Sequence, residues 1–444
     1  MRISIIGTGY VGLVSGVCFA EIGHECVCVD IDPAKVARIN AGDPPIHENG
    51  LEPMLQRLIG KGIRATTDLR AAVLETDATF IAVGTPFDGT RIDLTYIREA
   101  ARQIGSVLRE KDRYHLVVVK STVVPGTTNG VVLPLLEESS GKRAGRDFGV
   151  GMNPEFLTEG TAIDDFMTPD RIVIGGIDER AIGAQKEIYA SFTNAQVLVT
   201  NNSTAEMIKY TSNSVLATMI SFSNEIGNVC SAIGGIDVND VMRGVHMARY
   251  FTATLDDGSR VKAGITSFLW AGCGYGGSCL PKDTRALSAH GAAHGEPMRL
   301  LDAVISTNTA QPDRLIKILE KYFPHLQGVK VAVLGLAFKE DTDDLRESVS
   351  IPIILKLIEL GADVVAYDPI AMSLAKPLLP VNTKFADSLA GAIAESDAAL
   401  VMTRWREFEQ IPKILASMKI PPMLIDGRRM LDPARIARYD GIGR

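Results

Sequence analysis

The chain has 444 residues, of which 46% are hydrophobic and 22% charged, and its formal net charge is −7. This balance is ordinary for a globular protein, and a chain of this length can bury large cores without disulfide or metal staples. The acidic balance disfavours nucleic acid as the main partner, because a nucleic-acid backbone is normally met by a basic face.

Cysteine and histidine content argues against a metal or disulfide protein. The six cysteines (18, 26, 28, 230, 273 and 279) are too sparse for a disulfide framework, and no cysteine or histidine cluster has zinc-ligand spacing. No stretch is long enough to span a bilayer, and glycines in the first twenty residues argue against a signal peptide. We therefore expect a cytoplasmic protein with neither a metal nor a membrane partner.

The first 30 residues predict one βαβ unit. A short strand (2–6) precedes GTGYVG (7–12), a helical stretch through Ile22, and a second strand that ends at Asp30. Such glycines permit a tight turn and close approach of a pyrophosphate, whose charge meets the free N–H groups at the helix start. Asp30 has the spacing of a ribose ligand and favours NAD over NADP, although Lys35 is nearby. The alternative is a glycine turn that serves packing alone.

Further strand-like runs lie at 78–86, 115–123, 148–156 and 171–176, with helical patterns between several of them. Alternation of this kind predicts a parallel sheet covered by helices.

The middle of the chain reads as helical. Residues 203–234 predict a helix of about nine turns, capped by Asn202, Ser203 and Thr204. A second helical stretch covers 284–323, with a break before Pro312.

A second α/β series begins near residue 328 and resembles the first, since GADVVAYD (361–368) parallels GHECVCVD (23–30). We therefore expect an α/β fold with two Rossmann-like, doubly wound parallel-sheet domains joined by a helical domain with a long central helix. The expected boundaries are 1–200, 201–315 and 316–444.

The second half lacks the pyrophosphate turn and carries GLAFKEDTDDLRES (335–348) in its place. Lys339 and Arg346 could meet a phosphate or a ribose there. They could equally pair with the acidic residues Asp341, Asp343 and Asp344, and the residues alone leave both possibilities open.

The segment GCGYGGSCLPKD (272–283) is too rich in glycine for a regular helix or strand, so we expect a loop that approaches a ligand closely. Cys279 at its end, near Lys282, could be a nucleophilic thiolate, and a buried structural cysteine is the alternative. A thiolate adds to an aldehyde, and the adduct can lose a hydride to NAD⁺ to give a thioester, which water hydrolyses. The two motifs together predict oxidation at the aldehyde level.

The chain resembles the UDP-glucose/GDP-mannose dehydrogenases over essentially its whole length. The segments that carry the resemblance, in family order, are GTGYVG, VGTP, STVVPGT, NPEFLTEGTAI, EMIKYTSN, GYGGSCLPKD and FKEDTDDLRES. The resemblance implies a four-electron oxidation of a sugar C6 hydroxymethyl to a carboxylate, with two NAD⁺ and without release of the aldehyde.

The resemblance also implies roles for individual residues. Cys279 is the expected nucleophile, Lys209 and Asn213 the expected oxyanion donors, and Asp283 a partner of Lys209 and a water, while Thr122 and Glu155 order the hydrolytic water. The expected NAD contacts are Gly7, Gly9, Tyr10, Val11, Gly12, Asp30, Lys35, Thr85, Thr122, Lys282 and Arg346. The expected substrate contacts are Phe156, Leu157, Glu159, Lys209, Asn213, Phe268, Gly276 and Lys339.

The substrate branch is less specific. SFLWAGCGYGGSC, TRWREF and DGRRMLDP are similar to the UDP-glucose branch, whereas the stretch before NPEFL has features of the GDP-mannose branch. UDP-glucose is the favoured substrate and GDP-mannose the alternative. Three departures are Thr158, the extra thiol Cys273 and a long segment at 249–270, where either Arg249 or Arg260 could reach a neighbouring subunit. The resemblance implies a homodimer or a larger homo-oligomer.

Two rival hypotheses remain. A two-electron hydroxy-acid dehydrogenase would explain the glycine turn and the Lys209–Asn213 pair but does not need Cys279. A non-catalytic, NAD-responsive scaffold would be expected to lack some of the chemical residues, yet all of them are present.

Overall fold

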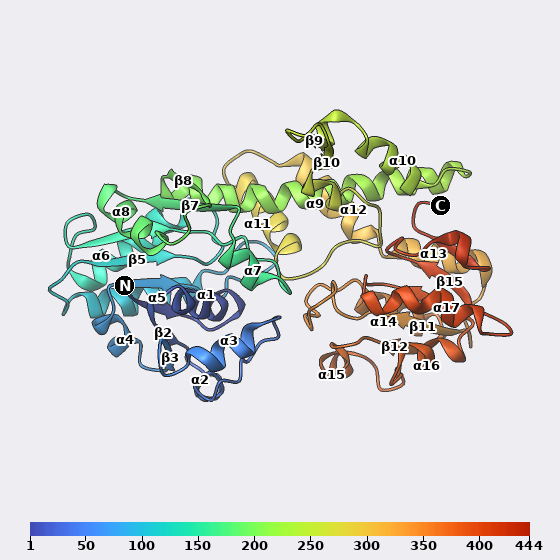
Figure 1. Cartoon of the computed structure of the whole chain (residues 1–444), viewed down its shortest axis with the longest axis horizontal. Coiled ribbons are helices and arrows are strands. Elements are labelled where there is room, and N and C mark those ends of the chain that lie inside the picture. Colours follow the sequence, from blue (N-terminus) through green and yellow to red (C-terminus); the bar gives the residue numbers. More distant parts are fainter. The chain divides into compact units, whose positions relative to one another are not determined.

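The computed structural model describes residues 1–444, which form two compact units, Met1–Ser212 and Asn213–Arg444 (Figure 1). One helix, α9 (Asn202–Ile233), contains the boundary and agrees closely with the predicted helix over 203–234. None of the helices combines the length and the apolar character needed to cross a membrane.

The first unit is built on an eight-stranded sheet with the order β3-β2-β1-β4-β5-β6-β7-β8. Its strands are β1 (Arg2–Ile6), β2 (Glu25–Val29), β3 (Ile63–Thr66), β4 (Ala78–Ile81), β5 (His115–Val119), β6 (Phe148–Met152), β7 (Arg171–Gly176) and β8 (Gln196–Thr200). All neighbouring strands are parallel except β6 and β7. The predicted α/β class is confirmed, and the antiparallel pair is a feature that the pattern of apolar runs did not indicate, because such runs carry no strand direction.

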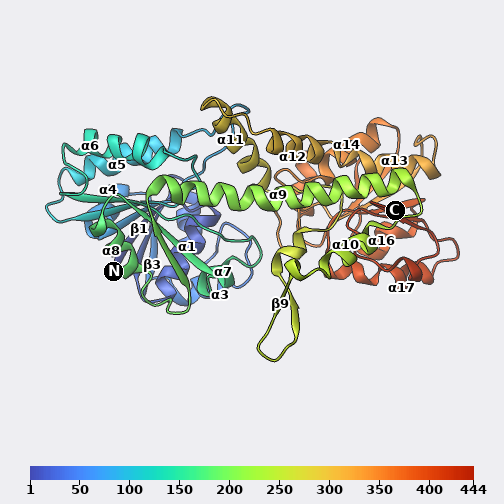
Figure 2. The ribbon, with the colours of Figure 1, turned by 90° about the horizontal axis from the view of Figure 1, so that it is seen from above.

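Helices cover both faces of this sheet (Figure 2). They are α1 (Tyr10–Glu21), α2 (Pro33–Asn40), α3 (Leu51–Leu58), α4 (Leu69–Glu75), α5 (Thr95–Leu108), the π-helix η1 (Thr128–Val132), α6 (Leu133–Ser140), α7 (Ala162–Met167) and α8 (Glu179–Ile188). Successive residues of β5 enter different cores, because side chains alternate along a strand. Leu116 and Val118 pack with α1, α3 and α7, whereas Val117 and Val119 pack with α4, α5 and α6.

The second unit is built on a six-stranded, fully parallel sheet with the order β13-β12-β11-β14-β15-β16. Its strands are β11 (Lys330–Leu334), β12 (Asp363–Tyr367), β13 (Lys384–Phe385), β14 (Ala398–Val401), β15 (Met423–Asp426) and β16 (Tyr439–Gly441). The helices that accompany this sheet are α14 (Ser350–Glu359), α15 (Met372–Ala375), η4 (Lys376–Leu378), α16 (Leu389–Ala394), η5 (Arg406–Gln410), α17 (Ile411–Ala416) and η6 (Pro433–Arg435).

The helical part of the second unit lies between α9 and this sheet in sequence. It contains α10 (Val238–His246), η2 (Arg249–Phe251), η3 (Gly264–Phe268), α11 (Leu280–Ala293), α12 (Arg299–Ala310) and α13 (Asp313–Tyr322). The predicted stretch 284–323 is therefore three helices rather than one with a single break. An antiparallel hairpin that was not predicted, β9 (Thr252–Thr254) and β10 (Arg260–Lys262), extends away from α9 and α10 (Figure 2).

Buried polar contacts join the helical part to the C-terminal sheet. Arg429, after β15, donates to both carboxylate oxygens of Asp237 at 2.8 and 2.7 Å. The N–H of Val238 donates to the carbonyl of Gly443 at 2.9 Å. The Arg429 side chain is 2% exposed and that of Asp237 is 27% exposed, so removal of Asp237 would leave a buried guanidinium unpaired. These contacts link the helical part to the C-terminal sheet.

The predicted similarity between the two α/β series is visible in their turns. Gly7 follows β1 with a φ of 100°, and Gly335 follows β11 with a φ of 98°. A Cβ would lie 2.7 Å from Ala82 O at Gly7, and 2.6 Å from the Thr403 side chain at Gly335. Each glycine is therefore required by a positive φ and by the close approach of the chain that follows the neighbouring strand.

Three predicted strands in the first unit were too long at their carboxyl ends. The strands end at Ile81, Val119 and Met152, whereas the apolar runs continue to 86, 123 and 156. The remaining residues are partly buried loops at the carboxyl edge of the sheet. This edge, next to the reversal of strand order between β1 and β4, is where ligands bind in open α/β sheets.

Candidate active site

The glycine turn has the geometry of a pyrophosphate cradle. A Cβ on Gly12 would lie 1.9 Å from the carbonyl of Gly7, so this position needs a glycine for packing. A Cβ on Gly9 would meet no atom within 4 Å, and Gly9 is the exposed N-cap of α1. Tyr10 and Val11 open the helix behind it. The start of α1 is therefore open to an anion, which the free N–H groups of a helix start favour.

Asp30 lies at the end of β2, beside this turn. Its Oδ2 accepts from the Thr8 N–H at 3.0 Å and from the Thr8 hydroxyl at 2.5 Å, and its Oδ1 accepts from the Asp32 N–H at 3.0 Å. Burial alone would raise the pKa of Asp30, but these hydrogen bonds and the charge of Lys35 on α2 lower it. An ionised carboxylate retains acceptor capacity for ribose hydroxyls. The turn and Asp30 thus fit a dinucleotide.

Two loops at the carboxyl edge are joined by a side chain. Thr85, after β4, donates its hydroxyl to the carbonyl of Thr122, after β5, at 2.8 Å. Both residues are predicted NAD contacts, and the structure brings their backbones together at the edge where β1 also ends.

Glu155 and Lys209 form a buried ion pair in the first unit. The Glu155 Oε1 lies 2.9 Å from the Lys209 Nζ on α9, and the two side chains are 5% and 4% exposed. The Glu155 Oε2 accepts from the Leu157 N–H at 2.7 Å. Burial alone would raise the pKa of Glu155, but the adjacent Lys209, the Leu157 N–H and the more distant Lys120 lower it. The carboxylate is therefore ionised and can act as a base.

Phe156, in the predicted substrate loop, lies beside this pair. The Phe156 ring lies 5.5 Å from the Lys209 Nζ and 3.9 Å from the guanidinium of Arg171. Glu48, which the sequence analysis missed, anchors the same loop. It accepts from the Tyr10 hydroxyl, from the Gly160 N–H at 2.6 Å and from the Ala162 N–H at 2.9 Å. Glu159 lies within the anchored loop and is half-buried.

Asn213 and Asp283 are hydrogen-bonded in the second unit. The Asn213 amide donates to the Asp283 Oδ2 at 2.6 Å, and Lys282 pairs with the other carboxylate oxygen. The Asp283 side chain is 1% exposed. Asn213 lies four residues after Lys209 on α9, so the two occupy successive turns of one helix, as predicted.

Cys279 is the N-cap of α11, and its residue is half-buried. The N–H groups of the first helical turn favour negative charge on the sulfur. Cys273, six residues earlier, is 0% exposed, and burial raises its pKa. It packs with the core of the C-terminal sheet, including Val331 and Val333. The structure therefore separates an accessible thiol from an inert one within the same loop.

The glycines of this loop permit close contact with the segment after β11. A Cβ on Gly276 would lie 2.1 Å from the carbonyl of Glu347, and the Gly277 N–H donates to the carbonyl of Arg346 at 2.9 Å. Arg346 itself forms an ion pair with Asp344 at 2.7 Å, which is the pairing left open above. Lys339 is half-buried on the same segment.

The remaining predicted residues lie near the hairpin. Phe268 is half-buried at the end of η3. Arg260 donates across the hairpin to the Thr252 hydroxyl at 2.6 Å, and Arg249 is exposed at the start of η2. Both arginines remain candidates for a contact with a neighbouring subunit.

Two further buried polar residues have tertiary contacts that the sequence did not predict. Glu206 on α9 accepts from the N–H groups of Gly126 and Thr128 at 2.6 and 2.7 Å and so anchors the loop that carries Thr122. Lys120 is buried directly after β5. For Lys120, the sequence signal was a charged residue at the end of an apolar run, because such a residue is buried only when it has a partner.

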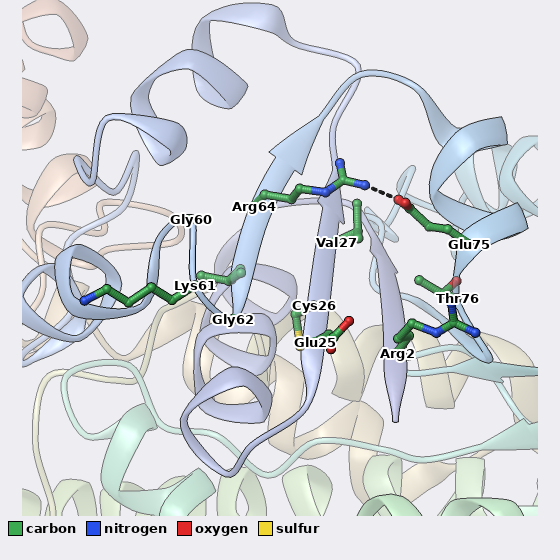
Figure 3. Close-up of a pocket in the computed structure, with 11 residues that line it drawn as sticks. Arg2, Glu25, Cys26, Val27, Gly60, Lys61, Gly62, Arg64, Glu75 and Thr76 are labelled. Atoms are coloured by element: carbon green, nitrogen blue, oxygen red, sulfur yellow. Dashed lines mark hydrogen bonds and ion pairs between the residues drawn. The ribbon is translucent and has the colours of Figure 1, made fainter.

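A cavity of about 320 Å³ lies at the opposite edge of the first sheet (Figure 3). It is lined by the first residues of β1, β2 and β3 and by the ion pair between Arg64 and Glu75. None of the predicted site residues lines it.

The chain is similar to known proteins along its whole length. It matches the UDP-glucose/GDP-mannose dehydrogenase family in the NAD binding domain over residues 1–193, the central domain over 203–310 and the UDP binding domain over 332–433. UDP-glucose 6-dehydrogenase AglM of Haloferax volcanii is 46% identical over 447 residues, with 100% of both chains covered. GDP-mannose 6-dehydrogenase of Pseudomonas syringae pv. syringae is 42% identical over 375 residues, with 83% of this chain and 81% of that relative covered. The structure of a UDP-glucose dehydrogenase from Pyrobaculum islandicum has a TM-score of 0.90 at 38% identity, with 100% of this chain and 97% of that chain covered.

Proposed function

Because the chain belongs to the UDP-glucose/GDP-mannose dehydrogenase family and is an NAD-dependent nucleotide-sugar 6-dehydrogenase, we propose that it oxidises UDP-glucose to UDP-glucuronate. The predicted cofactor, NAD, is confirmed, because residues 1–193 of the chain match the NAD binding domain of the family. The full-length similarity to a UDP-glucose 6-dehydrogenase supports this substrate over GDP-mannose, for which the similarity covers less of the chain.

We assign one function to each of three predicted domains: residues 1–200 bind NAD, 201–315 form the dimer contact and 316–444 bind the UDP-sugar. The matched ranges of the three family domains support this division. Gly7, Gly9, Gly12 and Asp30 would hold the dinucleotide, and bound NAD⁺ supplies the hydride acceptor for each of the two oxidations.

The chain's own residues would carry the covalent steps. The Cys279 thiolate adds to the C6 aldehyde, which forms a C–S bond and places negative charge on the C6 oxygen. Lys209 and Asn213 stabilise this oxyanion as charged and neutral hydrogen-bond donors. After loss of the second hydride, C6 is a thioester. Water then attacks the thioester carbonyl, Glu155 takes one water proton, and the C–S bond breaks to release the Cys279 thiolate and a carboxylic acid, which loses its proton to solvent.

One observation carries this proposal: Cys279 is half-buried at the start of α11, while Cys273 is completely buried. A dehydrogenase that stops after one hydride transfer needs no thiol. Asp283, held by Asn213 and Lys282, lies one helical turn after this thiol, and its N–H donates to the carbonyl of Cys279 at 2.9 Å.

The test is the number of NADH molecules formed per sugar consumed, with UDP-glucose and GDP-mannose offered separately. We expect two per UDP-glucose and no turnover of GDP-mannose. Two per GDP-mannose would retain the mechanism and change the substrate. One per sugar would contradict the thioester route and favour a two-electron dehydrogenase.

We also propose that the protein is a homodimer formed through α9. Val215, Phe222 and Val229 are 40%, 53% and 50% exposed and are spaced by seven residues. Residues with this spacing lie on one face of a helix and form the seam of paired helices. The exposed apolar stripe supports a second copy of the chain as its occupant.

A further inference from the structure

Lys120 is a buried charge that the proposed mechanism does not use. It follows directly on β5, whose residues are all buried, and is itself 3% exposed. Its Nζ donates to the Asn153 Oδ1 at 2.9 Å. The same oxygen accepts from the Tyr189 hydroxyl at 2.5 Å, and the Asn153 Nδ2 donates to the carbonyl of Val173 at 2.9 Å. The amide is held on both sides, so the lysine that binds it has a defined position.

The amide bond does not neutralise this charge, because an amide oxygen is an uncharged acceptor. Burial and the charge of Lys209 lower the pKa of Lys120 to about 8, against the attraction of Glu155. Cys18, on α1, also acts on the pKa of Lys120. The Phe166 ring lies 5.8 Å from the Lys120 Nζ. Val119 and Met152 are paired at the ends of β5 and β6, so Lys120 and Glu155 follow neighbouring strands at the same edge of the sheet, and Asn153, which holds Lys120, lies two residues before Glu155. Glu155 is in turn paired with Lys209.

We propose that Lys120 is a positioning residue: from the carboxyl end of β5 it supplies a second ammonium group, besides that of Lys209 on α9, that keeps the Glu155 carboxylate ionised. The inference rests on the proposed role of Glu155 as the base of thioester hydrolysis. A buried carboxyl group favours its protonated form, which cannot accept a proton from water. The charge of Lys209 opposes protonation of Glu155, but Lys209 is also the proposed donor to the substrate oxyanion.

The two cations therefore have different tasks. When the Lys209 charge is directed to the oxyanion, its hold on Glu155 weakens at the step that needs the carboxylate. Lys120 is bound to Asn153 and packed beside Phe166, so its charge stays in place through that step. Lys209 can therefore donate to the substrate oxyanion while Lys120 continues to stabilise the ionised Glu155.

The test compares Lys120→Met, which removes the charge at similar length, with Lys120→Arg, which retains it. Loss of a nearby opposite charge raises a carboxyl pKa, so we expect the pKa of Glu155 to rise by about one unit in Lys120→Met and little in Lys120→Arg. The pKa is followed by NMR of protein labelled with ¹³C at the glutamate carboxyl and assigned with Glu155→Gln. In turnover, the acid limb of the kcat profile should move to higher pH by the same amount.

Lys111→Met is the matched control. Lys111 is a second buried lysine, placed before β5 at the opposite edge of the sheet, where its Nζ donates to the Val73 carbonyl at 2.6 Å and its pKa is also about 8. We expect this variant to lose stability without changing the pKa of Glu155. An unchanged Glu155 pKa in Lys120→Met, or an equal shift in Lys111→Met, would overturn the inference. The NMR measurement needs no turnover, so it tests Lys120 even if the wild-type protein fails to form two NADH from UDP-glucose.

Discussion

Two thiols six residues apart illustrate how the tertiary environment assigns chemistry to a residue. Cys273 is enclosed by the apolar core of the second unit, which raises its pKa and denies it solvent. Cys279 is the N-cap of α11 and is half-buried. Nucleophilicity needs both the thiolate and access, so of these two only Cys279 meets the requirements of the proposed mechanism.

Cys279→Ser should lower kcat by at least about 100-fold, because a hydroxyl is a weaker nucleophile and an alkoxide a poorer leaving group than a thiolate. Steady-state NADH formation measures the loss, and mass spectrometry of the quenched variant would detect a trapped ester. Cys273→Ala is the control, for which we expect two NADH per UDP-glucose and a modest loss of stability. Normal turnover in Cys279→Ser would contradict the covalent route.

At the scale of elements, the turn after the first strand differs between the two sheets in how its aspartate is used. In the first unit, Asp30 binds the backbone and hydroxyl of Thr8 and is half-buried. In the second, Asp368 is 1% exposed and accepts from the N–H groups of Leu336 and Ala337 and from the Trp405 indole. The second aspartate is therefore occupied by the turn after β11 and by Trp405, and that turn, GLAFKE (335–340), also lacks the second and third glycines of GTGYVG.

Substitutions at the first two glycines of the turn, Gly7 and Gly9, should separate effects on folding from effects on cofactor binding. Gly7→Ala forces a methyl group to within 2.7 Å of Ala82 O at a φ of 100°. It should lower the free energy of unfolding by about 2 kcal/mol or more. Gly9→Ala meets no atom within 4 Å at a φ of −69° and should leave stability nearly unchanged. Its methyl group stands where the pyrophosphate approaches, so NAD⁺ affinity should fall at least about tenfold.

Urea unfolding and calorimetric titration with NAD⁺ measure these two effects separately. Wild-type NAD⁺ affinity in Gly9→Ala would show that the turn is not the pyrophosphate site. Unchanged stability in Gly7→Ala would show that the close approach to Ala82 is not required for folding.

At the scale of the whole molecule, apolar surface remains exposed on one long helix. Phe222 is 53% exposed at the centre of the stripe formed with Val215 and Val229 on α9. A charge placed at the centre of an apolar interface is desolvated without a partner, which is strongly unfavourable. Phe222→Glu should therefore give a monomer, whereas the wild-type protein should have the mass of two chains.

Light scattering at working concentration measures the mass of both proteins. Ile420→Glu is the control, because Ile420 is 76% exposed but lies outside the stripe, and it should leave the mass unchanged. A monomeric wild-type protein, or a dimeric Phe222→Glu variant, would remove the proposed role of α9.

The amino-acid sequence by itself determined the features that depend on neighbours along the chain. GTGYVG forms the turn after β1 and the first residues of α1, because glycine alone tolerates the φ of Gly7 and the spacing at Gly12. The helical pattern of a long stretch without proline placed α9 within one residue at each end, since 203–234 was predicted and Asn202–Ile233 is observed. These signals are local, so they could be interpreted without knowledge of the fold.

Tertiary structure alone decided which distant residues meet. The pairing of Glu155 with Lys209, 54 positions apart, the burial of Cys273 and the second cation Lys120 follow from how the strands and helices pack. So does the antiparallel pairing of β6 and β7. The physical reason is that burial and charge depend on the surroundings in space, and many sequence-distant segments must assemble before a side chain acquires those surroundings.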